Sequence, residues 1–390
     1  MLKKEVFYWG MYDLANTIFS ALFVTFFFPF YVKTFLGGNE FQIGLVFGLS
    51  MLLVAILVPI IGAWSDNLGR RMPFIIIFTV ICCLLTLLVS YTTLALALIA
   101  GFFANFSYHA ALTTYNALLP KIAGKYDLGK ISGIGIGMGY IGTLISLAIA
   151  AIILSRLGWE TIEGSKAMFV LTAILFFTLS LFTFFGIKEK KKIETKGFFS
   201  ALENVKKTIV QAKKHKTFFR FLLAMFFYAN AIFAIIVFLF LYARTQLNLS
   251  VQAFFAVYLI QSVGAVIGSL IAGKYVDKYN SKTVLWYSGV LWVIVVAALM
   301  LFTNLVVFII AGTIGGAALG AVWTAQRPKL LELVPKKNVG QFFGFLELTN
   351  KFSGVFGPIV FGWLAKYYSY QAGMASVILF FAIGLIMLRD

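Results

Sequence analysis

Long apolar segments alternate with short polar turns along the whole chain. A membrane-spanning helix needs roughly 20 consecutive apolar residues, because lipid offers no hydrogen-bond partner to the backbone. Twelve such segments occur, at residues 12–33, 41–64, 73–93, 95–119, 131–155, 166–187, 218–243, 251–273, 283–302, 304–326, 340–365 and 370–388. The pattern predicts an all-α integral membrane protein with twelve transmembrane helices.

The longest polar connection, residues 188–217, separates the sixth segment from the seventh. We therefore expect an N-terminal six-helix half (1–187), a basic cytoplasmic linker (188–217) and a C-terminal six-helix half (218–390). Six spans in each half give the two halves the same orientation in the membrane. Halves arranged in this way are typical of the major facilitator fold.

Short internal repeats support this duplication. The Ala-Asn-x-Ile-Phe pattern around Asn16 recurs around Asn230, at an offset of 214 positions. The Pro-Lys pair at Pro120 recurs at Pro335, at an offset of 215. The two offsets are nearly equal, which favours one ancestral six-helix unit present twice.

Composition agrees with a chain that lies in lipid. Hydrophobic residues make up 61% of the sequence, charged residues 12%, and the mean hydropathy is +0.96. The sequence has no phosphate-binding loop, nucleophile elbow or Cys/His metal cluster, so we expect no enzyme activity, no cofactor and no metal. Cys82 and Cys83 are adjacent within the third span and are expected to act as small apolar residues.

The formal net charge of +18 is explained by topology rather than by nucleic-acid binding. With a cytoplasmic N-terminus, 26 Lys and Arg residues fall on the cytoplasmic side and 5 on the outer side. This bias follows the positive-inside rule. It predicts a multi-pass protein of the cell membrane with both termini in the cytoplasm, and a linker that lies on anionic lipid head groups. We expect a monomer whose partners are the bilayer and a small solute.

Two charged turns occupy equivalent places in the two halves. The residues that define them are Gly62, Asp66, Gly69, Arg70 and Arg71 in the first, and Gly273 and Asp277 in the second. Glycine permits a tight turn, and the acid and basic side chains can pair when neighbouring helix ends approach. We interpret these residues as a cytoplasmic gate that pairs and separates as the halves move.

The first turn resembles the loop 2–3 signature of the major facilitator superfamily. A narrower resemblance, to the unknown-major-facilitator family, rests on five motifs: Trp9 to Asn16, Tyr115 to Pro120, Gly139 to Gly142, Phe342 to Phe345, and Lys351 followed by Gly357-Pro358. The eukaryotic members of that family are autophagy-related vacuolar effluxers of amino acids. The resemblance implies alternating access by rocking of the halves, a cavity lined by helices 1, 4, 7 and 10, and an amino-acid substrate. The acid usual in helix 7 is replaced here around Ala229 and Asn230.

Polar residues inside these helices are the candidates for substrate binding or coupling. They are Asp13 and Asn16 on helix 1, Asn105, His109 and Asn116 on helix 4, Tyr228 and Asn230 on helix 7, and Arg327 on helix 10. Spacings of three and four residues place those of one helix on one face. The same pattern is typical of helix–helix hydrogen bonds, and both interpretations stand.

Ionisable residues within spans are costly, by about 2.5–3.5 kcal/mol on insertion scales, and so are informative. Asp13 is interpreted either as an N-terminal helix cap or as a transport residue, and His109 either as a buried neutral side chain or as a protonatable one. Glu347 and Lys351 lie four residues apart on one face of helix 11. They either neutralise each other or, respectively, carry a proton and bind a substrate carboxylate.

The sequence thus predicts a secondary active transporter of a small polar solute, with amino acids suggested by the resemblance and coupling to a proton or other cation gradient. The alternatives are an integral membrane enzyme, a lipid scramblase, and a receptor derived from a transporter. An enzyme would require clustered catalytic carboxylates or histidines near one membrane face, which the sequence lacks.

Overall fold

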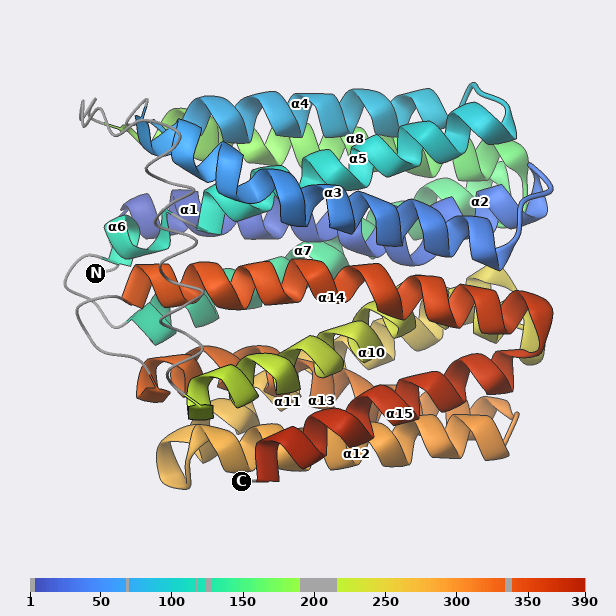
Figure 1. Ribbon diagram of the computed structural model, residues 1–390. Helices are drawn as coiled ribbons and strands as arrows, with labels where there is room; N and C mark the ends of the chain where they lie inside the picture. Colours follow the sequence, from blue (N-terminus) through green and yellow to red (C-terminus); the bar gives the residue numbers. More distant parts are fainter. Residues whose placement is uncertain are drawn as a thin grey trace.

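The computed structural model describes residues 4–67, 70–116, 118–123, 128–189, 216–333 and 339–389. Within these ranges some side chains lie outside the described part, among them those of Asp66, Asp277, Glu347 and Lys351. Every described element of secondary structure is a helix (Figure 1). The predicted all-α class is confirmed.

The helices match the predicted segments closely. The first span consists of α1 (Lys4–Ile18), the π-helical η1 (Phe19–Phe27) and α2 (Phe28–Thr34). The rest of the N-terminal half contains α3 (Glu40–Asn67), α4 (Met72–Val89), α5 (Leu94–Asn116), the short α6 (Leu119–Ala123), α7 (Leu128–Leu157) and α8 (Ile162–Gly186). The C-terminal half contains α10 (Lys216–Gln246), α11 (Val251–Lys278), α12 (Ser281–Leu301), α13 (Leu305–Leu333), α14 (Val339–Tyr367) and α15 (Tyr370–Arg389).

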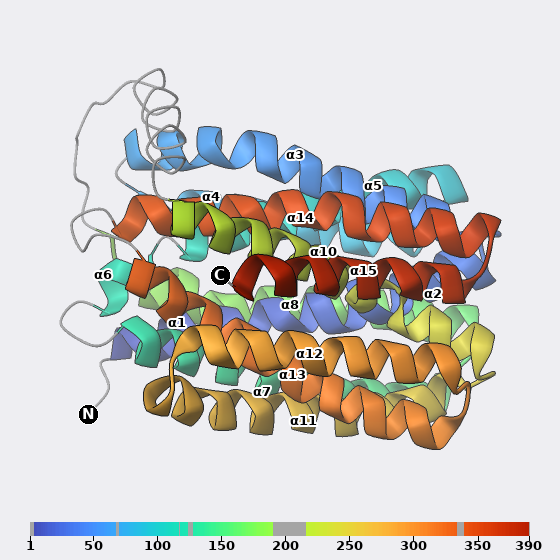
Figure 2. The same cartoon turned by 60° about the horizontal axis from the view of Figure 1, so that its bottom comes forward.

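In the described part of the chain, 11 helical spans are long and apolar enough to cross a membrane. Helix α14 has 29 residues and lies beside them in the same bundle. The helices run roughly alongside one another, with the N-terminal half above and the C-terminal half below in Figure 1. Both termini lie towards one end of the bundle, here called the terminal end; the opposite end is the far end (Figures 1 and 2).

Several helices begin at a residue that satisfies their free backbone N–H groups. Thr161, Ser250 and Asn280 accept hydrogen bonds from the N–H groups of residues three positions later, at 2.9, 3.1 and 2.8 Å. Such caps are the ordinary start signal of a helix. They fix where α8, α11 and α12 begin.

The first helix begins eight residues earlier than the sequence pattern indicated. The Trp9 ring stacks on Tyr115 with centroids 4.8 Å apart, and Tyr12 lies 4.7 Å from the same ring. This aromatic packing extends the helix back to Lys4 and places Asp13 in its third turn. The interpretation of Asp13 as an N-terminal cap is therefore wrong, because the helix already has two turns of packed structure before it.

Helix α14 joins the two halves. On one side it crosses α3, where Gly44 lies against the backbone of Pro358. On the other side it packs against α10, where Gly357 faces the backbone of Asn230 and leaves no room for a larger side chain. Small residues at these crossings let helix backbones approach closely, as is usual in membrane bundles.

Candidate functional site

A cavity of about 340 Å³ lies between the two halves. Its wall is formed on one side by α1, η1 and α7, and on the other by α10, α11, α12 and α13, with contributions from α14 and α15. Sites for small molecules commonly measure roughly 300–1,000 Å³. The cavity therefore has the volume for a small organic molecule.

Two residues of opposite charge line this cavity from opposite halves. Asp13 belongs to α1 and Arg327 to α13, and their side chains interact electrostatically. The Asn16 amide donates a hydrogen bond of 3.4 Å to the Asp13 carboxylate. Gly135 of α7 makes room for that carboxylate, since a Cβ at position 135 would collide with it. The site thus has an acidic and a basic group close to one another.

One nitrogen of the Arg327 guanidinium, Nη1, is buried and has no hydrogen-bond partner among the described residues. Buried polar groups in proteins almost always have a partner, and an exception calls for an explanation. A bound anionic group would supply one.

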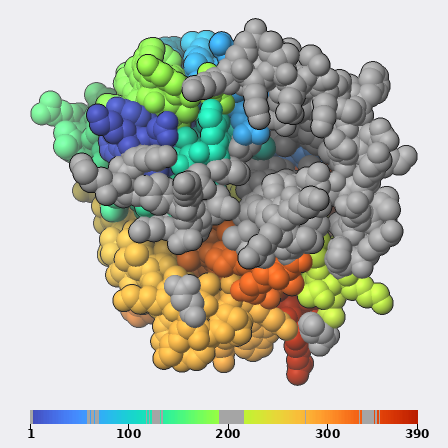
Figure 3. Space-filling view, turned by 90° about the vertical axis from the view of Figure 1, so that its left-hand side faces the viewer, coloured from blue at the N-terminus to red at the C-terminus, as the bar shows by residue number. Residues whose placement is uncertain are grey.

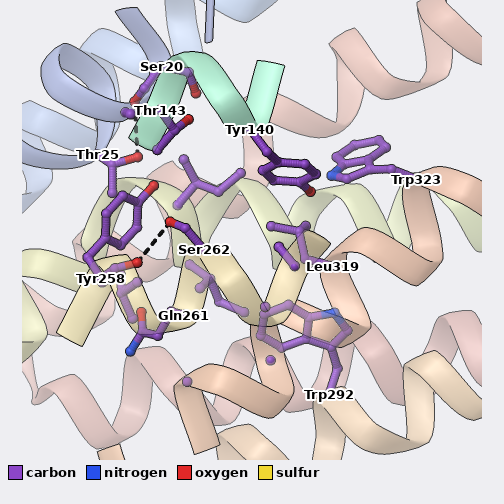
Figure 4. Close-up of a pocket in the computed structure, with 18 of the residues that line it drawn as sticks. Ser20, Thr25, Tyr140, Thr143, Tyr258, Gln261, Ser262, Trp292, Leu319 and Trp323 are labelled. Carbon is purple, nitrogen blue, oxygen red and sulfur yellow. Dashed lines mark hydrogen bonds between the residues drawn. The ribbon is translucent and has the colours of Figure 1, made fainter. Parts of the chain in front are cut away.

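Most of the remaining wall is aromatic or aliphatic. Tyr140 and Trp323 lie side by side at one edge, and Trp292 lies below Leu319 (Figure 4). The Trp292 ring stacks on Phe381 at 5.5 Å and 8°, which holds it in place. This lining suits a solute with an apolar body as well as charged groups.

A group of hydroxyl side chains faces the same space: Ser20, Thr25, Thr143, Tyr258 and Ser262 (Figure 4). Thr25 donates to the Ser20 carbonyl, five residues earlier, at 3.0 Å, and Ser262 donates to the Tyr258 carbonyl at 2.8 Å. The first bond belongs to the π-helical turn η1. Segments of this kind are rare and occur frequently at functional sites.

The fourth predicted span is α5 in the structure, and its polar side chains contact other residues of the bundle. Asn105 donates to Ser50 of α3 at 2.7 Å, and the Tyr108 hydroxyl donates to Asn16 at 3.5 Å. His109 packs edge-on against Tyr108 and Phe233. Except for the ring contact between Tyr108 and His109, these contacts lie between helices, and the described lining of the cavity has no residue of α5. The expectation that the fourth span lines the cavity is not met, because the polar side chains of α5 contact residues of the bundle and not the cavity.

The seventh predicted span is α10 in the structure, and two of its candidate residues also form hydrogen bonds with neighbouring helices. The Tyr228 hydroxyl donates to the Leu285 carbonyl at 3.1 Å. The Asn230 side chain accepts from the Gly357 N–H at 2.7 Å and donates to the Phe226 carbonyl at 2.8 Å. Both residues connect α10 to neighbouring elements, and any role of theirs in transport stays a prediction.

The other predicted residues are distributed as follows. Asn116 is the last residue of α5 and is half-buried. Glu347 and Lys351 belong to α14, but their side chains lie outside the described part. The same holds for the gate residues Asp66 and Asp277, for Gly62, and for the whole of Gly69. Gly273 lies in α11 with open space beside it.

A described polar contact lies in the predicted gate region. The Glu189 carboxylate accepts hydrogen bonds from the backbone N–H groups of Arg71 and Met72, at 2.7 and 2.8 Å. It also lies 4.0 Å from the Lys121 ammonium, while Arg70 is exposed. An acid at a helix N-terminus is favoured by the helix dipole. Glu189 therefore holds the start of α4 in place at the terminal end.

The cavity wall contains residues that the sequence did not single out. Gln261, Tyr242 and Trp292 belong to α11, α10 and α12, and they line the C-terminal side. The periodic pattern of apolar and polar residues along each helix did not distinguish them from residues packed in the core. Among the described residues, no group of three or more His, Cys, Asp or Glu is placed to hold a metal ion.

A bundle of apolar helices in two halves around a central cavity defines a membrane transporter by its architecture. The family model of the Major Facilitator Superfamily matches residues 14–265 and 256–389. The chain belongs to this superfamily.

Relatives and solved structures agree with this assignment. The chain is 25% identical to the uncharacterised MFS-type transporter YxiO of Bacillus subtilis, over 97% of this chain and 93% of that one. It is 23% identical to autophagy-related protein 22-1 of Aspergillus fumigatus, over 61% of this chain and 44% of that one. The crystal structure of the nucleoside transporter NupG has the same fold, with a TM-score of 0.71, 16% identity, and coverage of 99% of this chain and 98% of that one. The predicted twelve-helix fold, its two halves and the assignment to transporters rather than enzymes are confirmed.

Proposed function

We propose that this transporter binds a zwitterionic, amino-acid-like solute in the cavity and moves it by alternating access. The observation that carries the proposal is that Asp13 and Arg327 line the same cavity, one from each half. The solute's ammonium group would pair with Asp13 and its carboxylate with Arg327. Its apolar part would lie against Trp292 and Trp323.

Three features support this assignment. Within the described part of the chain, the Nη1 atom of Arg327 has no hydrogen-bond partner, and a substrate carboxylate would provide one. The cavity volume of about 340 Å³ suits a single amino acid or a similarly small solute. The sequence resemblance to amino-acid effluxers points to the same class of substrate. We propose that the chain acts as a monomer in the cell membrane and uses a proton or other cation gradient.

Binding to the purified protein tests the substrate class. Thermal unfolding is followed in the presence of amino acids, sugars, nucleosides and hydrophobic dyes, because a ligand that binds the folded state raises its apparent stability. Amino acids should raise the melting temperature. Removal of either charge, by Asp13→Asn or Arg327→Gln, should weaken binding at least about tenfold, because each removes a charge-assisted contact.

The matched control is Lys329→Gln. Lys329 lies two residues from Arg327 and pairs with Glu332 outside the cavity. It should leave binding unchanged. Unchanged binding in both cavity variants would refute the assignment and leave Asp13 and Arg327 as a pair that only neutralises charge.

Vesicles loaded with the solute then separate transport from its alternatives. Uphill movement driven by an imposed gradient supports coupled transport. Binding without flux would indicate a receptor, and movement of labelled lipid in place of solute would indicate a scramblase. In Asp13→Asn vesicles, retained exchange with lost accumulation would assign the coupling ion to that carboxylate.

A further inference from the structure

Near the far end of the bundle, several contacts join the two halves. Some of them are between aromatic rings from both halves. Phe26 of η1 stacks on Phe240 of α10, with ring centroids 4.4 Å apart. The rings of Phe254 and Phe255 of α11 lie 5.0 and 5.1 Å from the Phe26 ring. These rings, here called the plug, form an apolar contact between the two halves.

One polar contact lies beside this plug. Glu40, the first residue of α3, is 7% exposed and accepts a hydrogen bond of 2.7 Å from the Tyr370 hydroxyl at the start of α15. Lys33, near the end of α2, pairs with the same carboxylate. This group, called lock 1, connects the first two helices of the N-terminal half to the last helix of the C-terminal half.

A second polar contact lies at the same end. Glu160, directly before α8, accepts hydrogen bonds from the Arg244 guanidinium at 2.9 Å and from the Val251 N–H at 3.1 Å. Arg244 lies near the end of α10, and Val251 is the first residue of α11. This group, called lock 2, connects the first two helices of the C-terminal half to the last helix of the N-terminal half.

The two locks are equivalent under the internal duplication. Each lock has three parts. The first is a cation from the end of the first helix of one half, and the second is a group at the start of the second helix of that same half. The third is a group beside the start of the last helix of the other half. In both, a carboxylate of the N-terminal half accepts a hydrogen bond from the C-terminal half, and in lock 1 Lys33 of the N-terminal half also pairs with that carboxylate. Separation of the halves at this end must break both.

We infer that these pseudo-symmetric locks hold the far-end gate closed and together set how often the cavity opens towards that side. Lock 1 has the larger effect, because its carboxylate is buried and a hydrogen bond to a buried charge contributes more than an exposed ion pair. Lock 2 is weaker, since the side chains of Arg244 and Glu160 are 32% and 36% exposed.

Access to the cavity from the far side measures this opening. Ala21 lines the cavity from η1 and is a suitable site for a reporter cysteine, in a background where Cys82 and Cys83 are replaced by Ala. Spheroplasts are treated with a membrane-impermeant maleimide. The labelling rate is compared with that of Gly38→Cys, a partly exposed position in the far-end loop that reports access to that side. If Gly38→Cys is labelled only in inside-out vesicles, the experiment is run in those vesicles.

We expect Tyr370→Phe, which removes only the hydroxyl, to raise the Ala21→Cys labelling rate about tenfold. Glu160→Gln should raise it up to about fivefold, because exposed pairs contribute little. The double variant should show the product of the two factors, since the locks share no residue. The matched control is Glu163→Gln, an exposed acid three residues from Glu160 that should leave the rate unchanged.

Two results would overturn the inference. The lock variants could label at the parent rate while Gly38→Cys labels fully, or Glu163→Gln could accelerate labelling as much as Glu160→Gln. Global unfolding is detected separately in the lock variants that retain the native cysteines. Cys82 is fully buried and should remain unlabelled in a folded protein.

Discussion

At the scale of single residues, polar side chains within the spans have two separate uses. Asp13 and Arg327 face the cavity, whereas Asn105, Tyr228 and Asn230 form hydrogen bonds between helices. In lipid an unpaired polar group is costly, so a side chain that finds a partner in a neighbouring helix stabilises the bundle. Residue type alone did not separate these uses, because both place a polar atom on an inward helix face.

Asn230 offers a direct test of the structural use. Its carbonyl oxygen accepts from the N–H of Gly357, which precedes Pro358, a residue with no N–H of its own. We expect Asn230→Ala to lower the free energy of unfolding by about 1–3 kcal/mol, the cost of an unsatisfied buried group. Thermal unfolding in detergent measures the change. The comparison is Gln371→Ala, which removes an exposed bond to Gln246 and should have little effect; equal effects of the two would contradict the prediction.

At the scale of elements, the ends of helices are fixed by short polar contacts. Ser281, the first residue of α12, donates to the Glu332 carboxylate at 2.7 Å, and Lys329 lies 2.9 Å from the other oxygen of that group. Partial burial opposes ionisation of Glu332, but these two hydrogen bonds and the lysine charge outweigh it and lower its pKa. The contact between α12 and α13 is therefore strongest while Glu332 is ionised.

A pH dependence follows from this contact. Because the pKa of Glu332 is lower in the folded state, its stabilising contribution is present above the ordinary carboxyl range and is lost as pH falls through the folded-state value. The contribution should be below about 1 kcal/mol, because the side chain is 41% exposed and solvent screens the pair. Glu332→Gln should reduce the melting temperature near neutral pH and leave it unchanged in acid. A destabilisation that is equal at both pH values would exclude the ionised contact.

At the scale of the whole molecule, the two halves meet near the far end and the cavity lies between them. The space-filling view from the terminal end shows the N-terminal half and the C-terminal half on opposite sides of that face (Figure 3). Alternating access requires the halves to separate at one end while they meet at the other. The far-end plug and locks are the contacts that such a movement must break.

Labelling from the two sides tests how the molecule lies in the membrane. The positive-inside bias predicts that a cysteine at Gly38, in the far-end loop, reacts with an impermeant maleimide only from outside. A cysteine at Gly197, in the basic linker, should react only from the cytoplasm. The measurement uses intact and permeabilised cells in parallel. Reversed labelling at both positions would invert the predicted orientation.

The sequence by itself determined the helices and the class of protein. Spans of apolar residues must become helices in lipid, since only a helix satisfies its own backbone, and each of the twelve predicted segments corresponds to one or more described helices. The duplication, carried by Asn16 and Asn230, and the charged turn around Arg70 and Arg71 then pointed to the superfamily. These features depend on local composition and order, which a linear pattern records.

Only the tertiary structure decided what individual residues do. In the structure α1 begins well before Asp13, and polar residues of α5 form contacts between helices. Asp13 and Arg327 lie close together although they are far apart in the sequence. The tertiary structure also brought Glu40 to Tyr370. Such pairs depend on which faces of distant helices meet, and this is set by side-chain packing and by small residues at the crossings. Periodicity along one helix carries no information about the helix it will face.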